Sequence, residues 1–144
     1  MMREVIINAD DLGLAASVDA AIVDLASRGI VTAASLMSLY APAQADLAEL
    51  ARQRISLGLH LDLTSAAACS RYACARPLRQ LIAASWCRRI DRRELKAAVR
   101  EQLDRFCQRV GAVPAFVDGH EHVHQFPMIR AALLEALAEL ALTP

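Results

Sequence analysis

The stretch that decides the fold is residues 5–37, VIINADDLGLAASVDAAIVDLASRGIVTAASLM. It begins with Val5-Ile6-Ile7, a short apolar run without a polar face, which is typical of a strand buried on both sides. We expect Ser17 to cap a helix that ends at Gly29, because apolar residues recur between them at helical spacing: Val18, Ala21, Ile22, Leu25 and Ala26. Ala34 to Met37 then predicts a second strand. Strand, helix and strand in this order predict a parallel β-α-β unit.

The same alternation continues along the rest of the chain. Asp91 with Glu94 three residues later predicts a capping box, and the helix that it opens ends at Gly111. Residues 65–90 have the least regular pattern, and we expect a loop there with a short helix over 78–86. In the helix after Asp91, the residues expected to face inward are Leu95, Val99, Leu103, Phe106 and Val110. The other expected elements are a helix over 42–52, a strand over 57–61, a strand over 115–117 and a helix over 127–142. This rhythm predicts an α/β fold whose parallel strands form an open sheet or part of a barrel.

Length and composition predict one folded domain over residues 1–144. The chain has 144 residues, of which 56% are hydrophobic and 22% are charged, the balance of a protein with a real core. We see no signal-peptide pattern, and the longest apolar stretch, residues 131–142, is interrupted by Glu135 and Glu139 and is too short to cross a bilayer. The four cysteines form no C-x-x-C pair. We therefore expect a cytoplasmic protein with reduced cysteines and no membrane partner.

Charge is unevenly distributed although the net charge is zero. Residues 69–109 hold eleven Lys and Arg against four Asp and Glu. A nucleic-acid partner is not expected, because few aromatic residues accompany these cations and Phe106 belongs to an apolar stripe. We interpret the basic residues as a solvated helix face. The alternative is that one of them meets an anionic group on a substrate, with three candidates: Arg71, Arg76 and Arg79.

Three short segments carry the residues that point to chemistry. Residues 118–124 read Asp-Gly-His-Glu-His-Val-His, so three of the four histidines of the chain fall within five residues. His60 ends another apolar run, and the pair Asp10-Asp11 ends a third. The carboxyl ends of parallel strands share one face, where α/β folds place their sites, so these segments predict a shared metal site. Each residue alone also has a structural interpretation, with Asp10 in a turn, Asp11 as a cap and His60 as a hydrogen-bonded core residue.

Four blocks in this sequence resemble the YdjC-like family of carbohydrate deacetylases: residues 7–14 (INADDLGL), 29–37 (GIVTAASLM), 58–61 (GLHL) and 118–124 (DGHEHVH). The resemblance implies an irregular TIM-like barrel that removes N-acetyl groups from small sugars such as chitin-derived disaccharides. It also implies one divalent metal ion held by Asp11, His60 and His120, with Asp10 as the general base that takes the proton of the attacking water. A neighbouring branch, associated with hopanoid lipid synthesis, has a different histidine pattern, and residues 118–120 look closer to the sugar-deacetylating branch.

The residue types suit this chemistry. One carboxylate and two imidazoles leave open metal positions for water and a substrate carbonyl, and such a set accepts zinc, magnesium or manganese, of which we favour magnesium and zinc. His122 or His124 is the candidate that protonates the departing amine. An extended backbone would put residues 120, 122 and 124 on one side, whereas a helical turn would pair only 120 with 124. The other role for His122, His124 and Asp118 is to orient a ligand histidine.

Two features depart from the family pattern. Leu12 stands where the family usually has phenylalanine, and family members run well beyond residue 144. The last predicted helix is apolar most of the way round, which predicts neighbours on several sides, and four strands would leave an unpaired sheet edge. We therefore expect the N-terminal part of a barrel, or a chain that completes itself by self-association as a homo-oligomer. Two other functional hypotheses remain: an inactive or partner-binding remnant, and a different metal-dependent hydrolase such as a phosphoesterase.

Overall fold

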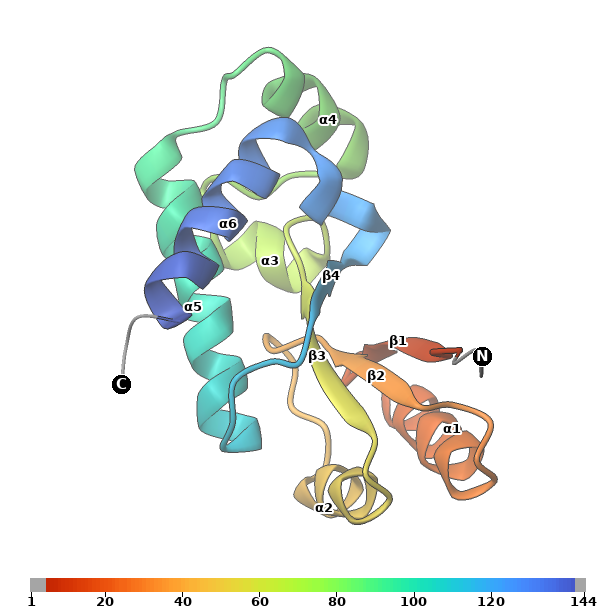
Figure 1. Cartoon of the computed structure of the whole chain (residues 1–144). Helices are drawn as coiled ribbons and strands as arrows, with labels where there is room; N and C mark the ends of the chain where they lie inside the picture. The colour runs from red at the N-terminus through yellow and green to blue at the C-terminus, as the bar shows by residue number, and fades with distance from the viewer. Residues whose placement is uncertain (1–4, 142–144) are drawn as a thin grey trace.

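The computed structural model describes residues 5–141 (Figure 1). Within this range four strands form one parallel sheet in the order β1-β2-β3-β4: β1 (Asn8–Leu12), β2 (Ala33–Leu36), β3 (Ser56–Leu61) and β4 (Val117–Gly119). The connecting helices are α1 (Ala16–Ser27), α2 (Gln44–Arg52), α3 (Ala66–Arg71), α4 (Leu78–Trp86) and α5 (Arg92–Val110), and β4 is followed by the 3-10 segment η1 (His120–Gln125) and by α6 (Pro127–Ala141). The predicted α/β class with parallel strands is confirmed.

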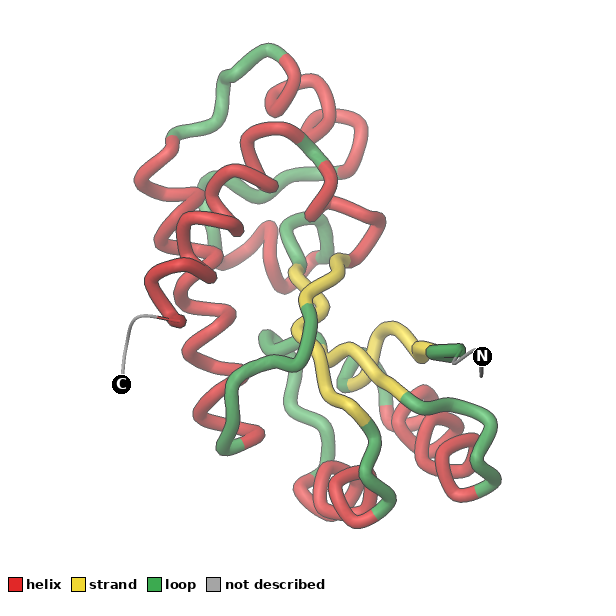
Figure 2. Tube along the Cα trace, in the orientation of Figure 1, coloured by secondary structure: helices red, strands yellow, loops and turns green. Residues whose placement is uncertain are grey.

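The strands lie between two groups of helices (Figure 2). In Figure 1, α1 and α2 lie together near β1 and β2, whereas α3 to α6 form a separate group at the β3–β4 side. None of the helices within residues 5–141 is long and apolar enough to cross a membrane. The sheet therefore joins two helical groups, and the candidate site residues lie on its strands and on η1, which follows β4.

The first strand differs from the prediction. It begins at Asn8, and the apolar residues that were expected to form it precede it, with Val5 and Ile6 74% and 79% exposed. Ile7 still pairs with β2, since its carbonyl accepts the Thr32 and Ala33 N–H groups. β1 is an outer strand of the described sheet, so an apolar run beside it has a neighbour on one side only. The expectation of a strand buried on both sides was wrong here.

Local helix signals were mostly reliable. Asp91 caps α5 by accepting the Arg93 and Glu94 N–H groups, and Gly111 ends the helix in the left-handed conformation, as predicted. α4 has the expected bounds, but α3 was missed, although Ser65 caps it by accepting the Ala68 N–H. α1 begins after Ala15 rather than at Ser17. The other predicted elements are present with ends shifted by one or two residues, and position 142 lies outside the described residues.

The core is one cluster that joins the sheet to helices on both sides, from α1 and α2 to α5 and α6. Its fully or nearly fully buried members come from strands and helices alike: Leu12, Leu36, Leu59, Leu61, Leu95, Val99, Leu103, Phe106, Ile129 and Leu133. Each such side chain contributes about 1.5–3 kcal/mol through burial. α6 packs against three elements, α4, α5 and η1, as expected of a largely apolar helix. Its outer face stays open, since Leu134 is exposed and Glu135 and Glu139 reach cations of α5.

Candidate metal centre

A β-bulge in β1 brings two adjacent carboxylates to the same site. In a regular strand Asp10 and Asp11 would point to opposite faces of the sheet. The register with β2 shifts between Ala9 and Leu12, and Asp11 has a left-handed backbone with φ 64°. As a result both carboxylates lie beside His60 of β3. Left-handed backbone at a non-glycine residue costs about 1–3 kcal/mol and is concentrated at functional sites.

A buried aspartate holds the turn that follows this bulge. Asp19, in the first turn of α1, accepts the Gly13 N–H at 2.6 Å, and the Leu14 N–H bonds to the Asp11 carbonyl at 3.0 Å. Gly13 itself has φ +96°, which side chains rarely adopt. The sequence interpretation missed Asp19. Its signal was an acidic residue in the middle of the otherwise apolar stripe of α1.

The histidine-rich segment adopts neither of the two conformations considered from the sequence. Glu121 and His122 both have left-handed backbones, with φ 51° and 58°, so η1 is neither extended nor a regular helix. His120 consequently points to Asp11, His122 is exposed, and His124 is half-buried against Gly119. A Cβ atom at Gly119 would lie 3.1 Å from the His124 Nδ1 atom, which explains why a glycine precedes His120.

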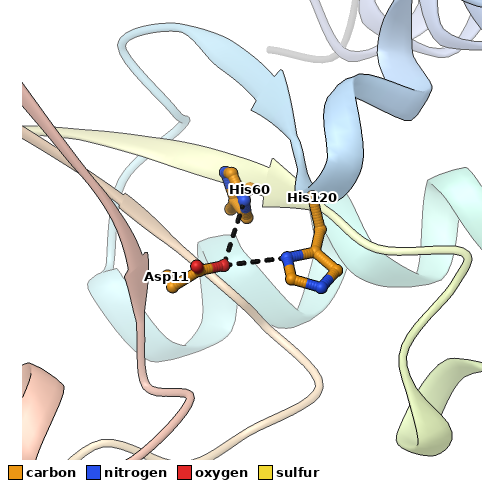
Figure 3. Close-up of side chains that lie close together, drawn as sticks. All are labelled: Asp11, His60 and His120. Carbon is orange, nitrogen blue, oxygen red and sulfur yellow. Dashed lines mark hydrogen bonds and ion pairs between the residues drawn. The ribbon is translucent and has the colours of Figure 1, made fainter.

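Three residues from distant parts of the chain converge, as Figure 3 shows. The Asp11 Oδ1 atom lies 3.2 Å from His60 Nε2 and 2.9 Å from His120 Nδ1, and one ligand atom of each residue lies within 4.8 Å of the others. His60 is 3% exposed, whereas Asp11 and His120 are partly open to solvent. One carboxylate and two imidazoles that face a common point, with an open side, fit a divalent ion with free positions for water and substrate.

Hydrogen bonds orient His60 for this role. Its Nδ1 atom lies 2.7 Å from Asp118 Oδ1 and 3.1 Å from Ser35 Oγ, so we assign the ring proton to Nδ1 and the lone pair to Nε2, which faces Asp11. Burial lowers the pKa of His60, but the hydrogen bond to Asp118 and the nearby carboxylate charges outweigh it, so the pKa is raised. Asp10, His60 and Asp118 also lie close enough to hold an ion. Because that arrangement would use the Nδ1 atom already bonded to Asp118, we interpret Asp118 as an orienting residue.

The two remaining histidines differ in their surroundings. Burial is the main cause of the lowered pKa of His124, whose ring also feels the charges of Asp118, His60 and Asp10. Its Nδ1 atom is buried and has no hydrogen-bond partner within the described residues. The exposed His122 ring lies edge-on to it, with centroids 6.4 Å apart. His124 is thus the candidate that lies beside the carboxylates.

The sequence interpretation missed two polar residues of this site, Asn8 and Ser35. The Asn8 amide bonds to Asp10 and Asp118, and the buried Ser35 lies under His60. A weak signal was present for Asn8, since it stands two residues before Asp10 on the same strand and so shares its face. Of the arginines suggested as anion contacts, Arg71 instead pairs with Glu101.

Comparison with known proteins identifies the family of this α/β domain with its candidate metal site. The model of the YdjC-like protein family matches residues 4–143, so the chain belongs to that family and the resemblance seen in the sequence is confirmed. A carbohydrate deacetylase from Geobacillus stearothermophilus is 32% identical over 96% of this chain and 57% of its own length. A chitooligosaccharide deacetylase from Escherichia fergusonii is 26% identical over 96% and 57%, and the human carbohydrate deacetylase is 30% identical over 92% and 44%.

A solved structure shares the fold. A candidate cellobiose-phosphate cleavage protein from Enterococcus faecalis V583 superposes with a TM-score of 0.74 at 21% identity, over 96% of this chain and 56% of its own. At that identity the likeness shows the fold alone. The chain spans about half the length of the curated relatives that it matches.

Proposed function

We propose that this protein takes part in metal-dependent hydrolysis of N-acetyl groups on small sugars of the chito-oligosaccharide type. The observation that carries the proposal is the convergence of Asp11, His60 and His120 from β1, β3 and η1. The names of the related deacetylases support the substrate class. A divalent ion held by these three residues would lower the pKa of water and polarise the amide carbonyl.

Asp10 is the general base in this proposal. It lies beside the ligand cluster without belonging to its ligand group, and it is exposed, so water can reach it. Asn8 and Ser35 contact its Oδ1 atom at 2.6 and 3.5 Å. A carboxylate fixed next to a water site can remove the proton of that water as it attacks the carbonyl carbon.

His124 is the proton donor to the departing amine. Burial lowers its pKa, so the neutral ring must first take up a proton, and the proton that Asp10 removes from the attacking water supplies it before His124 passes it to the amine. A histidine with a lowered pKa gives up that proton readily. His122 is the exposed alternative, and the two are separable by mutation.

The test is acetate release from N-acetylated chito-oligosaccharides by the wild-type protein with added Mg²⁺, Zn²⁺ or Mn²⁺. We expect acetate release to depend on the ion. The rate of release should fall at least about 100-fold in Asp10→Asn, the variant of the base, and by a smaller factor of about 10-fold or more in His124→Ala. His122→Ala is the matched control from the same segment. A folded sample that binds the ion and releases no acetate would contradict the proposal.

That outcome would support the second candidate, a protein that holds a metal ion without turnover. The observation that favours it is that ion binding needs only the ligand group of Asp11, His60 and His120, which the described residues contain. Acetate release separates the two candidates, because calorimetric titration is expected to show ion binding in both cases and release is expected from only one.

A further inference from the structure

We propose that Asn8 is a positioning residue, whose side-chain amide holds the Asp10 and Asp118 carboxylates and, through Asp118, orients His60. The inference rests on the proposed function in that Asp10 is taken as the base and His60 as a metal ligand. It goes beyond that function by assigning a role to an uncharged residue of β1, the only asparagine in the chain.

The four strands of the sheet each contribute one residue to a connected polar layer: Asn8 from β1, Ser35 from β2, His60 from β3 and Asp118 from β4. The Asn8 Nδ2 atom lies 3.1 Å from Asp118 Oδ2, although β2 and β3 separate their strands. The sheet must therefore curve strongly, so that side chains of its outer strands meet over the inner ones. Such a layer would ordinarily be packed with aliphatic side chains, as in the interior of a parallel barrel.

Both oxygen atoms of Asp118 have a partner in this layer. His60 Nδ1 lies 2.7 Å from Oδ1, and Asn8 Nδ2 lies 3.1 Å from Oδ2. Held at both ends, the carboxylate can keep the His60 ring in the orientation that turns Nε2 to Asp11. Removal of the amide would leave Oδ2 without this donor and allow Asp118 to rotate.

The same amide contacts the second carboxylate. Asn8 Nδ2 lies 2.6 Å from Asp10 Oδ1, and an amide has two N–H groups, one for each carboxylate. Two carboxylates that approach each other repel, and the donor between them offsets this repulsion without adding a charge. An aspartate of the same shape at position 8 would instead add a third negative charge.

A purely structural role does not account for Asn8. Its Oδ1 atom is buried and has no hydrogen-bond partner within the described residues. A buried unpaired oxygen costs about 1–3 kcal/mol, so a residue kept for stability alone would be expected to satisfy both ends of the amide. The satisfied end is the one that faces the carboxylates.

The experiment compares Asn8→Asp and Asn8→Ala with the wild type and with Thr32→Val. The control removes a contact between the residues just before β1 and β2, because Thr32 Oγ1 accepts the Ile7 N–H at 3.0 Å and does not touch the carboxylates. Calorimetric titration with Zn²⁺ and Mn²⁺ is expected to show affinity about 10–100-fold lower in both Asn8 variants and unchanged in Thr32→Val. Long-range ¹H–¹⁵N spectra of the metal-free protein, recorded at a pH at which the His60 ring is neutral, are expected to show its proton on Nδ1 in the wild type and the control. In both Asn8 variants we expect the proton to be distributed over Nδ1 and Nε2, because Asp118 is no longer held in place.

The two readouts separate this inference from the proposed function. If the wild type releases no acetate or binds no ion, the proposed function fails, and the His60 spectra still decide the role of Asn8. Wild-type affinity and a wild-type His60 tautomer in Asn8→Asp would overturn the positioning role even in an active enzyme. Loss of the folded circular-dichroism spectrum in both Asn8 variants would also overturn it, because the residue would then be structural. In an active protein we expect kcat to fall about 10-fold or more with KM nearly unchanged.

Discussion

The α5–α6 helix pair and the β1–η1 site segments are built by opposite rules. α5 has an aspartate cap, an apolar stripe and a terminal glycine, and its exposed cations Arg92, Lys96 and Arg100 pair with glutamates of α6. β1 instead has a bulge, and the non-glycine residues with left-handed backbone include Asp11 of β1 and Glu121 and His122 of η1. Regular packing thus stabilises the domain, while three of the five described non-glycine residues with left-handed backbone lie in the site segments, the other two being Arg54 and Arg88 just after α2 and α4.

The largest effect should come from the regular region. Phe106 of α5 is fully buried, and Phe106→Ala is expected to lower the free energy of unfolding by about 3–5 kcal/mol, because it creates a cavity in the core. Chemical denaturation measures this loss. Leu134→Ala, at an exposed position of α6, is the control, and its free energy of unfolding should change by no more than about 0.5 kcal/mol. The comparison predicts that the folded fraction of Phe106→Ala keeps wild-type metal affinity, and a weaker affinity would show that packing and site are coupled.

The reverse pattern is expected at the site. His120→Ala and Asp11→Asn each remove a ligand atom from the cluster, so zinc affinity should fall about 100-fold or more, which corresponds to at least about 2.7 kcal/mol. Their metal-free unfolding free energy should change by no more than about 1 kcal/mol, because both side chains are partly exposed. His122→Ala is the matched control and should keep the affinity. A metal-free protein that unfolds in His120→Ala would contradict the separation of site from scaffold.

This division explains how far the sequence could predict the molecule. The bounds of α4, the Asp91 cap and Gly111 depend on neighbours within a few residues, and the local pattern predicted them. The position of β1 was wrong because its polar residues serve the site, whereas the apolar run before it resembles a strand more closely. In that segment the requirements of the site outweigh strand propensity.

The membership of the site was predictable only in part. Asp11, His60 and His120 could be assigned from the family motif, and the structure brings them together. Asn8 was missed because its contact with Asp118 joins residues 110 positions apart. The conformation of η1 was unpredictable for another reason, since two consecutive left-handed residues that are not glycine run against backbone preference.

A glycine substitution sharpens the comparison, because it should have opposite signs in the two regions. Glu121 is exposed and left-handed, so Glu121→Gly removes backbone strain of about 1–2 kcal/mol, offset by about 0.5–1 kcal/mol of unfolded-state entropy. The net gain should therefore lie between about 0 and about 1.5 kcal/mol. Gln108→Gly in α5 should instead destabilise by about 0.5 kcal/mol through lower helix propensity. Equal destabilisation by both changes, measured by denaturant unfolding without metal, would argue against strain at η1.

The smallest effect concerns the cap of α5. Hydrogen bonds from the Glu94 and Arg93 N–H groups lower the pKa of Asp91. The pKa of Asp91 is lower in the folded protein than in the unfolded chain, where it lies near 3.8. The ionised cap therefore stabilises the protein fully at a pH above 3.8, and this stabilisation is lost as the pH falls through the lower pKa of the folded protein. Asp91→Ala should therefore lower the melting temperature by a few degrees at pH 7, and the difference from the wild type should shrink as the pH falls below 3.8. Because Asp91 belongs to the regular region, metal affinity at pH 7 should not change. A variant that bound zinc more weakly would show that the start of α5 reaches the site, and the two regions would then not be independent.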